Sequence, residues 1–423
     1  MINTDKRKNA HGKIFFGLTL AIAFTIPVYG RLIPLLIALL FLNWLIEGNY
    51  LKTIRLISRE RERLAMFSFS SLYFLYLLGL SYTSNYAYAW DDLMLKFSIL
   101  LFPLIFATAG SPVFTAAQTG TILRVFAAGC IAGSMVLLGQ AFYFSVFMHQ
   151  ADAFYYSNLS WSFHPSYYAL YLTFALSNIL FFYLIGGQVN GARNRAMHIL
   201  ILLFFTLMVV LLSSKAGLVI WVLVICFYTF LLCFRYRRWL AGLMFLSVAM
   251  GTFFLFLQTF PVAVSRVSQA RQDVASKDSV EQTARSTNER KLIWKSSEKV
   301  IMQNFIFGVG TGDTRDALLK QYREDNILTL LKHYLNAHNQ YLQTFIALGV
   351  IGLLCLILTI LVPAVMAFRQ GSYIYFCFLL VVGVSLFVES MFETQAGVVF
   401  FAFFNMVLFA SRNDSRMRHA TQR

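Results

Sequence analysis

The sequence predicts an all-α, polytopic membrane protein. Apolar residues make up 58% of the 423 positions and charged residues 13%, whereas soluble globular domains contain about 45–50% and about 25%. The apolar residues are gathered into blocks of about 20, which is the length that a helix needs to cross the hydrocarbon of a bilayer. Barrel strands are about half as long. The spans are therefore expected to be helices.

Hydropathy predicts about twelve spans. They lie near residues 14–29, 32–46, 64–82, 93–109, 121–147, 166–185, 197–213, 216–233, 239–258, 341–367, 373–389 and 396–410. The first is expected to be a retained span, because no small-residue cleavage site follows its apolar stretch. The predicted domains are spans one to nine over 1–258, a large loop over 259–337, spans ten to twelve over 338–410 and a basic tail over 411–423.

Basic residues in the short loops orient the predicted bundle. They fall in alternate loops, so all of them lie on one side of the membrane, and short basic loops resist translocation. Both termini are therefore expected on the cytoplasmic side. The net charge of +16 indicates topology and contact with anionic headgroups rather than nucleic-acid binding. The residues are Lys6, Arg7, Lys8, Lys13, Lys52, Arg55, Arg59, Arg61, Arg63, Arg193, Arg195, Arg235, Arg237, Arg238, Arg369, Arg412, Arg416 and Arg418.

The loop over 259–337 is too long for the charge rule and is expected outside the membrane. Its first part, Ser265 to Thr287, is rich in serine, glutamine and charges, which is typical of a mobile or partly ordered segment. Ser286 and Glu289 have the spacing of a capping box, so a helix is expected to begin there.

Two further features divide the rest of this loop. The glycine-spaced turn Gly308 to Gly312 is interpreted as the end of that helix rather than as a phosphate cradle. The stretch Thr314 to Leu335 is amphipathic at helical spacing. It is expected to lie against the membrane surface or to cover a cavity.

Charged residues within spans or at their ends are energetically costly, so each is a candidate functional residue. Two histidines, His149 and His164, lie at the edges of another outer loop. The candidates on the predicted outer side are Arg31, Asp91, Asp92, Lys215, Arg266, Arg290, His338, Glu389 and Glu393.

Three of these candidates have both a structural and a functional interpretation. Lys215, at a junction between two spans, is either a snorkelling lysine or a cation beside a membrane-embedded anion. Arg290 is either an exposed helix arginine or a phosphate ligand. His338 is either an interfacial hydrogen-bonding residue or a catalytic base. Spacing alone does not decide between these interpretations.

The order of several short motifs resembles the O-antigen ligase family, part of the ligase and polymerase superfamily of bacterial envelope polysaccharides. The resemblance covers residues from about 160 to 410. The motifs are Ser213-Ser-Lys215, Arg290-x-x-x-Trp294, Phe307-Gly-Val-Gly310, His338-Asn-x-Tyr341-Leu-Gln343 and Leu348-Gly-Val-Ile-Gly352, together with His164-Pro-Ser-Tyr167 and Glu389-Ser-Met-Phe-Glu-Thr-Gln-Ala-Gly397.

The resemblance implies a GT-C-like, metal-independent glycosyltransferase of the bacterial inner membrane with a periplasmic active site. Its donor would be a glycan on undecaprenyl diphosphate, and its acceptor would be lipid A-core. The enzyme would be surrounded by membrane lipids. Arg290 and His338 match the family positions that hold the diphosphate and activate the acceptor hydroxyl. Lys215 stands where the family usually has arginine, and a lysine lacks the planar fork that grips phosphate through two bonds.

The chemistry of these residues fits that reaction. Positive charge stabilises a departing diphosphate, and a neutral histidine can take the proton of an attacking hydroxyl near neutral pH. Glu389 and Glu393 are expected to orient His338 or to pair with Arg290, with Trp294, Asn339 and Tyr341 as supporting residues. All five cysteines lie within apolar blocks, and no metal site or cofactor is predicted.

Alternative functions remain open at this point. A polymerase would use the same donor with a second lipid-linked glycan as acceptor, and a protein O-oligosaccharyltransferase would use a protein hydroxyl. A polysaccharide or lipid transporter is the alternative outside the enzymes. Many transporters have two similar halves with broken helices at the midplane. Neither feature is visible in this sequence, which favours an enzyme.

Overall fold

The computed structural model describes residues 2–48, 50, 61–109, 114–161, 163–186, 191–260, 286–327, 330–331 and 336–420. Within these ranges the chain forms helices and turns and has no strand, so the expected all-α architecture is confirmed. The main elements are α1 (Ile2–Thr25), η1 (Gly30–Leu32), α2 (Ile33–Glu47), α4 (Arg61–Ser68), α5 (Ser71–Leu78), η2 (Gly79–Tyr82), α6 (Tyr86–Lys96), α7 (Ser98–Thr108), α8 (Ala116–Phe147), α9 (Tyr156–Leu159), α10 (Pro165–Leu184), α11 (Ala192–Leu212), α12 (Lys215–Phe230), η3 (Leu231–Arg235), α13 (Trp239–Thr259), α15 (Ser286–Gln303), α16 (Thr314–Glu324), α18 (Gln340–Arg369), α19 (Tyr373–Val388), η4 (Met391–Glu393) and α20 (Gln395–Ala420).

Eight helical segments in the described part of the chain are long and apolar enough to cross a membrane, as a polytopic membrane protein requires. Two shorter apolar helices, Tyr373–Val388 and Gln395–Ser411, accompany them. The predicted number of about twelve spans stays a prediction. The eight segments are Gly30–Glu47, Arg63–Tyr82, Ala116–Phe147, Pro165–Leu184, Ala192–Leu212, Lys215–Arg235, Trp239–Thr259 and Gln340–Arg369.

The predicted span over 93–109 differs most from the structure. The chain there forms two helices, α6 and α7, which meet at Phe97, and neither is long enough to cross a membrane alone. The first part of this stretch contains Lys96, which is fully buried and paired with carboxylates. A hydropathy window averages over that single charge, so the prediction from sequence merged the two helices into one span.

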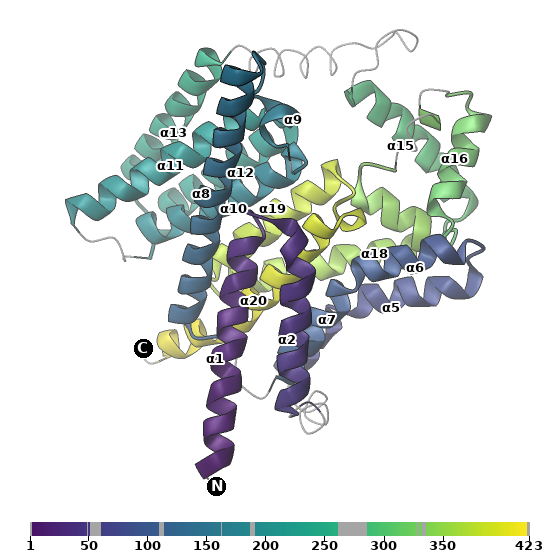
Figure 1. Cartoon of the computed structure of the whole chain (residues 1–423), viewed down its shortest axis with the longest axis horizontal. Coiled ribbons are helices and arrows are strands. Elements are labelled where there is room, and N and C mark those ends of the chain that lie inside the picture. The colour runs from purple at the N-terminus through teal and green to yellow at the C-terminus, as the bar shows by residue number, and fades with distance from the viewer. Residues whose placement is uncertain are drawn as a thin grey trace.

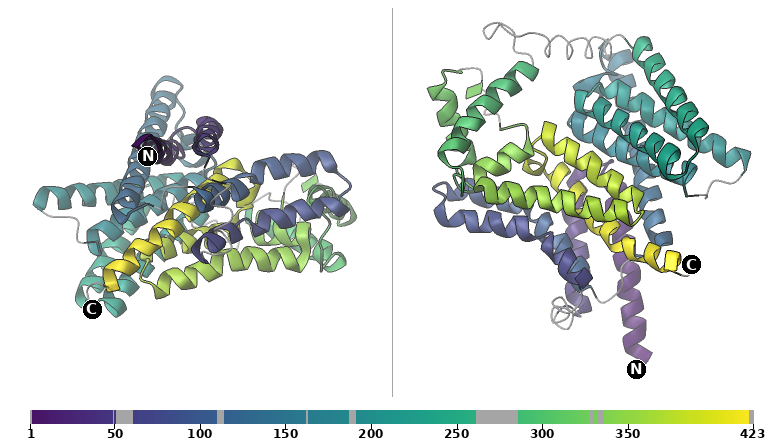
Figure 2. Two further views of the ribbon diagram at one scale, coloured as in Figure 1. Left: turned by 90° about the horizontal axis from the view of Figure 1, so that it is seen from below. Right: turned by 180° about the vertical axis from the view of Figure 1, so that it is seen from behind.

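Helix α10 lies at the centre of the bundle. It is the most buried of the eight segments, with 83% of its most apolar window inside the protein. Its Phe174 ring packs against Phe126 of α8, Phe378 of α19 and Phe404 of α20. Helices α18, α19 and α20 lie next to one another in the middle of the molecule (Figure 2). This aromatic core packs α10 against α8, α19 and α20.

The amino-terminal helices form a separate layer, in which α1 packs against both α2 and α8 (Figure 1). Gly133 of α8 allows the closest approach, because a Cβ at this position would overlap the carbonyl oxygen of Pro27. Small residues permit such close helix contacts in membranes. The start of α1 and the end of α20 lie toward the same end of the molecule (Figure 1).

The large loop folds into a compact unit of its own. Helices α15 and α16 pack together, and α15 also packs against the first part of α18 (Figure 1). Ile293, Leu318, Tyr322 and Ile346 are buried between these helices. In the described part of the amphipathic stretch, the apolar face that includes Leu318 and Tyr322 therefore contacts α15. Of the predicted loop, residues 261–285, 328–329 and 332–335, and so Arg266 and most of the segment over 265–287, lie outside the described residues, as do Lys52, Arg55 and Arg59.

The glycine-spaced segment after α15 docks onto a break in α18. Gly349 has a φ of 64°, which interrupts the helix. The Val309 N–H donates to the Ile346 carbonyl at 2.8 Å, and the Val350 N–H donates to the Phe305 carbonyl at 2.9 Å. Gly308 itself lies against the Ala347 carbonyl, where a Cβ would be only 2.5 Å from the oxygen. Helix α15 itself ends earlier, at Gln303, and the glycine-spaced segment fastens the loop to α18.

We predict that Gly308→Ala destabilises the protein more than Gly371→Ala. Both glycines have a φ of 73°, but no atom lies within 4 Å of a Cβ at Gly371. The left-handed backbone costs alanine about 1–2 kcal/mol at either position, and overpacking adds about 1–3 kcal/mol at Gly308 alone. Thermal unfolding of both variants in one detergent measures the difference. Equal losses would show that the docked segment contributes no stability.

Candidate functional site

A cavity of about 180 Å³ brings Lys215, Arg290 and His338 together, although 123 residues separate the first from the last in sequence. The cavity lies where the folded loop meets the ends of several helices of the bundle. Its other lining residues are Tyr156, His164, Ser166, Ser213, Ser214, Ala216, Glu289, Ile293 and Glu389.

Three helices begin at this cavity. His164 is the N-cap of α10, Ser214 is the N-cap of α12, and His338 directly precedes Asn339, the N-cap of α18. The first turn of a helix carries unpaired N–H groups and a positive partial charge, which makes it a favourable place for an anion. Two cationic side chains, Lys215 and Arg290, add to this positive charge, and two carboxylates, Glu289 and Glu389, lie in the same lining.

Close packing holds two of these helix starts side by side. A Cβ at Gly217 of α12 would lie 2.5 Å from the Cβ of Ala169 in α10. The Ser214 hydroxyl, which accepts from the Gly217 N–H, donates to the Ser166 hydroxyl at 3.3 Å. Because Gly217 has no side chain, α12 can contact α10 closely. This contact places Lys215, two residues earlier, at the cavity.

Glu389 connects the charged residues of the cavity. Its Oε1 accepts from Arg290 Nη2 at 2.9 Å and from the Ser166 hydroxyl at 3.1 Å, and its Oε2 lies 3.4 Å from His338 Nδ1. Glu389 is 6% exposed, whereas the Arg290 and His338 side chains are 29% and 30% exposed. The carboxylate is thus covered by the arginine and the histidine, which both face the cavity.

The surroundings keep Glu389 ionised and His164 neutral. Burial raises the pKa of Glu389, but the hydrogen bond from His338 and the charge of Arg290 outweigh burial, so the pKa lies below its ordinary value. Burial lowers the pKa of His164, and this effect exceeds the opposing one of Glu389. Glu389 therefore loses its charge only as the pH falls through this lowered pKa, and its contacts with Arg290 and His338 persist at neutral pH.

An ionised Glu389 determines which nitrogen of His338 is basic. A carboxylate only accepts hydrogen bonds, so His338 Nδ1 must carry the proton in their contact. In the neutral ring Nε2 then has the lone pair. Within the described residues Nε2 has no hydrogen-bond partner. This arrangement can accept a proton from a hydroxyl placed in the cavity.

Strained backbone is concentrated around the same cavity. Tyr156, Ser213 and His338 have φ values of 51°, 46° and 44°, a left-handed conformation that is uncommon for residues other than glycine. They are three of the six such residues in the described part of the chain. Backbone strain of this kind tends to gather at functional sites.

Three predicted supporting residues hold the His338 turn from outside the cavity. Trp294 Nε1 donates to the Ala337 carbonyl at 3.1 Å, and the Asn339 N–H donates to the Ser390 hydroxyl at 3.1 Å. The Tyr341 hydroxyl donates to the Gly383 carbonyl at 3.0 Å and so joins α18 to α19. These contacts fix the positions of His338 and Glu389 relative to each other.

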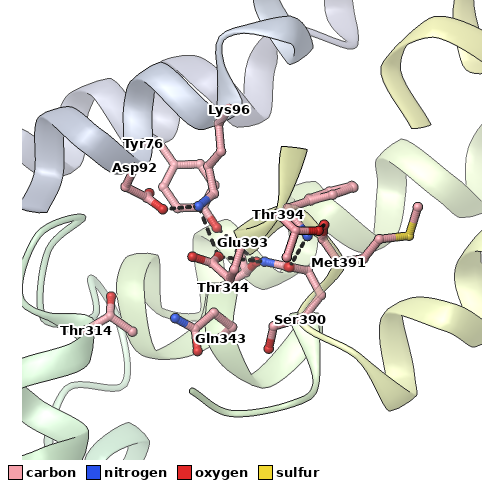
Figure 3. Close-up of polar contacts among 12 residues, drawn as sticks. Tyr76, Asp92, Lys96, Thr314, Gln343, Thr344, Ser390, Met391, Glu393 and Thr394 are labelled. Atoms are coloured by element: carbon pink, nitrogen blue, oxygen red, sulfur yellow. Dashed lines mark hydrogen bonds and ion pairs between the residues drawn. The ribbon is translucent and has the colours of Figure 1, made fainter. Parts of the chain in front are cut away.

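Glu393 does not join Glu389 at the cavity. Its Oε1 lies 3.0 Å from Lys96 Nζ, and the same ammonium pairs with Asp92 (Figure 3). Gln340 Nε2 donates to Glu393 at 3.4 Å. Sequence reasoning missed Lys96 because it falls inside an apolar block. The four-residue spacing from Asp92, which is that of a helical ion pair, was the available signal.

The O-antigen ligase family model, Wzy_C, matches residues 200–357. This match confirms the resemblance that the motifs predicted, and it includes Lys215, Arg290 and His338 but not Glu389. A comparison with curated proteins gave no match. The match supports a function of the ligase or polymerase type. Together with the membrane-length helices, it indicates a membrane enzyme of the glycosyltransferase kind.

We predict that Lys96→Met destabilises the protein far more than Lys299→Met. Lys96 is fully buried between two carboxylates, whereas the Lys299 side chain is 47% exposed in its pair with Asp325. Removing one partner of a buried pair costs about 3–5 kcal/mol, and an exposed pair contributes about 0–1 kcal/mol. Thermal unfolding compares the two. The prediction fails if both variants lose the same stability, or if removing all three charges with Asp92→Asn and Glu393→Gln restores none of it.

Proposed function

We propose that the protein transfers a glycan from undecaprenyl diphosphate to a hydroxyl of lipid A-core, as an O-antigen ligase. The observation that supports this most strongly is the single cavity in which two cations and a carboxylate-bound histidine lie together. Diphosphate departure needs positive charge, and hydroxyl attack needs a base. Neither the cations nor the histidine alone would serve both requirements.

The proposed reaction is one displacement at the anomeric carbon. His338 Nε2 takes the proton from the acceptor hydroxyl as its oxygen bonds to the anomeric carbon. The bond from that carbon to the diphosphate oxygen breaks, and undecaprenyl diphosphate leaves with the electron pair against Lys215 and Arg290. Glu389 stabilises the imidazolium that forms. Displacement from the opposite face inverts the configuration, and no residue forms a covalent intermediate.

The helix starts add to this charge. Diphosphate oxygens near the first turns of α10 and α12 would meet N–H groups as well as side chains. Lys215 would act as a compact positive charge and Arg290 as the ligand with a planar fork. Arg290 also holds Glu389, so it would link diphosphate binding to the orientation of His338.

The proposed location is the bacterial inner membrane, with both termini cytoplasmic and the cavity periplasmic. The alternating basic loops favour this orientation. In Figure 1 the N-terminus lies at the lower edge and the C-terminus in the lower half, whereas α9 and α15, which supply cavity residues, lie in the upper half. An exported glycan would then meet the cavity after it has crossed the membrane.

We expect His338→Ala to reduce glycan transfer by about 10²- to 10⁴-fold, the usual contribution of a positioned base. Purified protein is incubated with lipid-linked glycan and either lipid A-core or further donor, and the product that grows is measured. His198→Ala is the matched control, because His198 lies in the first turns of α11, where it contacts the Asn194 carbonyl and the Tyr183 ring and does not line the cavity. Near wild-type transfer by His338→Ala would exclude it as the base. Growth of lipid-linked glycan alone would identify a polymerase.

We expect substitutions of Arg290 and Lys215 to differ in their effect on activity. Arg290→Ala should reduce kcat/KM for the donor by roughly tenfold to a hundredfold, the value of a charged hydrogen bond, while Lys215→Arg stays active and Lys215→Ala does not. Lys295→Ala, an exposed substitution in the same helix as Arg290, is the control. Loss of activity in Lys215→Arg with tolerance of Lys215→Ala would mean that position 215 is crowded structure and does not contact phosphate.

A further inference from the structure

A second polar cavity of about 430 Å³ lies between α6 and α16. Its lining combines hydrogen-bond acceptors, amide donors and apolar surface, which is unlike the cationic cavity around Lys215. Residues from four separate parts of the chain form it, namely Tyr88, Asp91, Asp92, Leu95, Arg315, Leu318, Asn336, Gln343 and Glu393.

The two cavities lie on either side of the same turns. Asn336 lines the second cavity, and its Oδ1 accepts from the His338 N–H at 3.0 Å. Gln343 lines it too, and its Oε1 accepts from the Ala337 N–H at 3.1 Å. Glu389 borders the first cavity and Glu393 the second, at the two ends of one short turn. A molecule in the second cavity is therefore held by the residues that position the proposed base.

Gln343 has an unused donor at this cavity. The side chain is 4% exposed, and its oxygen is engaged by Ala337. Its Nε2 makes no hydrogen bond with any residue that the structure describes. Because Gln343 lines the cavity, a ligand with a hydroxyl oxygen placed there would accept the hydrogen bond that this nitrogen can donate.

The charges of this cavity disfavour a phosphate. Lys96 Nζ faces two carboxylates, Asp92 and Glu393 (Figure 3), so this cluster has no surplus positive charge to offer. The lining also contains Arg315 and the exposed Asp91, which carry opposite charges. By contrast, the first cavity is lined by two cations, Lys215 and Arg290, against two carboxylates, Glu289 and Glu389, whereas the second is lined by one cation and three carboxylates. The two cavities are thus suited to ligands of different charge.

We infer that the second cavity binds an uncharged saccharide and that this saccharide is the end of the acceptor; the inference rests on the proposed function. Sugar hydroxyls both donate and accept, so they can satisfy the carboxylates and the amides at once. The ring of Tyr88 and the side chains of Leu95 and Leu318 can cover the apolar face of a sugar ring. The sugar would reach His338 past Asn336.

The test measures KM separately for donor and acceptor, with whichever acceptor the wild-type protein uses. Gln343→Glu keeps the oxygen that accepts from the Ala337 N–H and removes the amide donor. Asp91→Asn removes the charge of an exposed carboxylate in the cavity lining. We expect each to raise the acceptor KM by about fivefold, the value of one hydrogen bond, with the donor KM within about twofold of wild type. Gln370→Ala, at the far end of α18, is the control.

Each outcome separates this inference from the proposed function. If the wild-type protein transfers no glycan to any acceptor, the proposed function fails. If it transfers glycan and neither variant changes the acceptor KM, the saccharide site is wrong while the proposed function stands. A lower kcat with both KM values unchanged would also overturn the site, because it would show that Gln343 only positions the His338 turn.

Discussion

The site depends on the buried carboxylate of Glu389. It accepts hydrogen bonds from Arg290, Ser166 and His338, and each of these residues lies on a different helix or turn. An uncompensated carboxylate at 6% exposure would be strongly unfavourable. The three donors must therefore stay close to it, and this requirement brings the folded loop, α10 and the start of α18 to one point. The position of His338, the proposed base, therefore follows from the need to neutralise the buried carboxylate of Glu389.

A second buried charge cluster supports the first. Lys96 fixes Glu393, and Glu393 contacts Gln340 at the start of α18. Gln340 also accepts from the Phe392 N–H at 2.6 Å. The turn that carries Glu389 is thus held at its other end by an ion pair from α6. Because Glu389 and Glu393 lie four residues apart and are each held by an ion pair, the two cavities keep a fixed relation.

The sequence was informative where the physics is local. Membrane-length apolar blocks predicted the helices, and the energetic cost of charge near a membrane was enough to identify Lys215, Arg290, His338 and Glu389 as candidates. Long-range pairing was not accessible in this way. Glu389 and Glu393 are four residues apart in similar surroundings, yet one contacts Arg290 and the other Lys96. Nothing in their spacing distinguishes them, because the partners come from distant helices. The docking of Gly308 against α18 was hidden for the same reason.

In the proposed reaction, Lys215 and Arg290 hold the diphosphate beside His338. A structure determined with undecaprenyl diphosphate bound is the decisive measurement, because phosphorus is rich in electrons and the protein has another cavity with a cation, lined by Arg31, Trp161 and Gln395. We expect both phosphates to lie between Lys215 and Arg290, with the first turns of α10 and α12 facing their oxygens. Phosphates bound beside Arg31, with the Lys215 cavity empty, would contradict it.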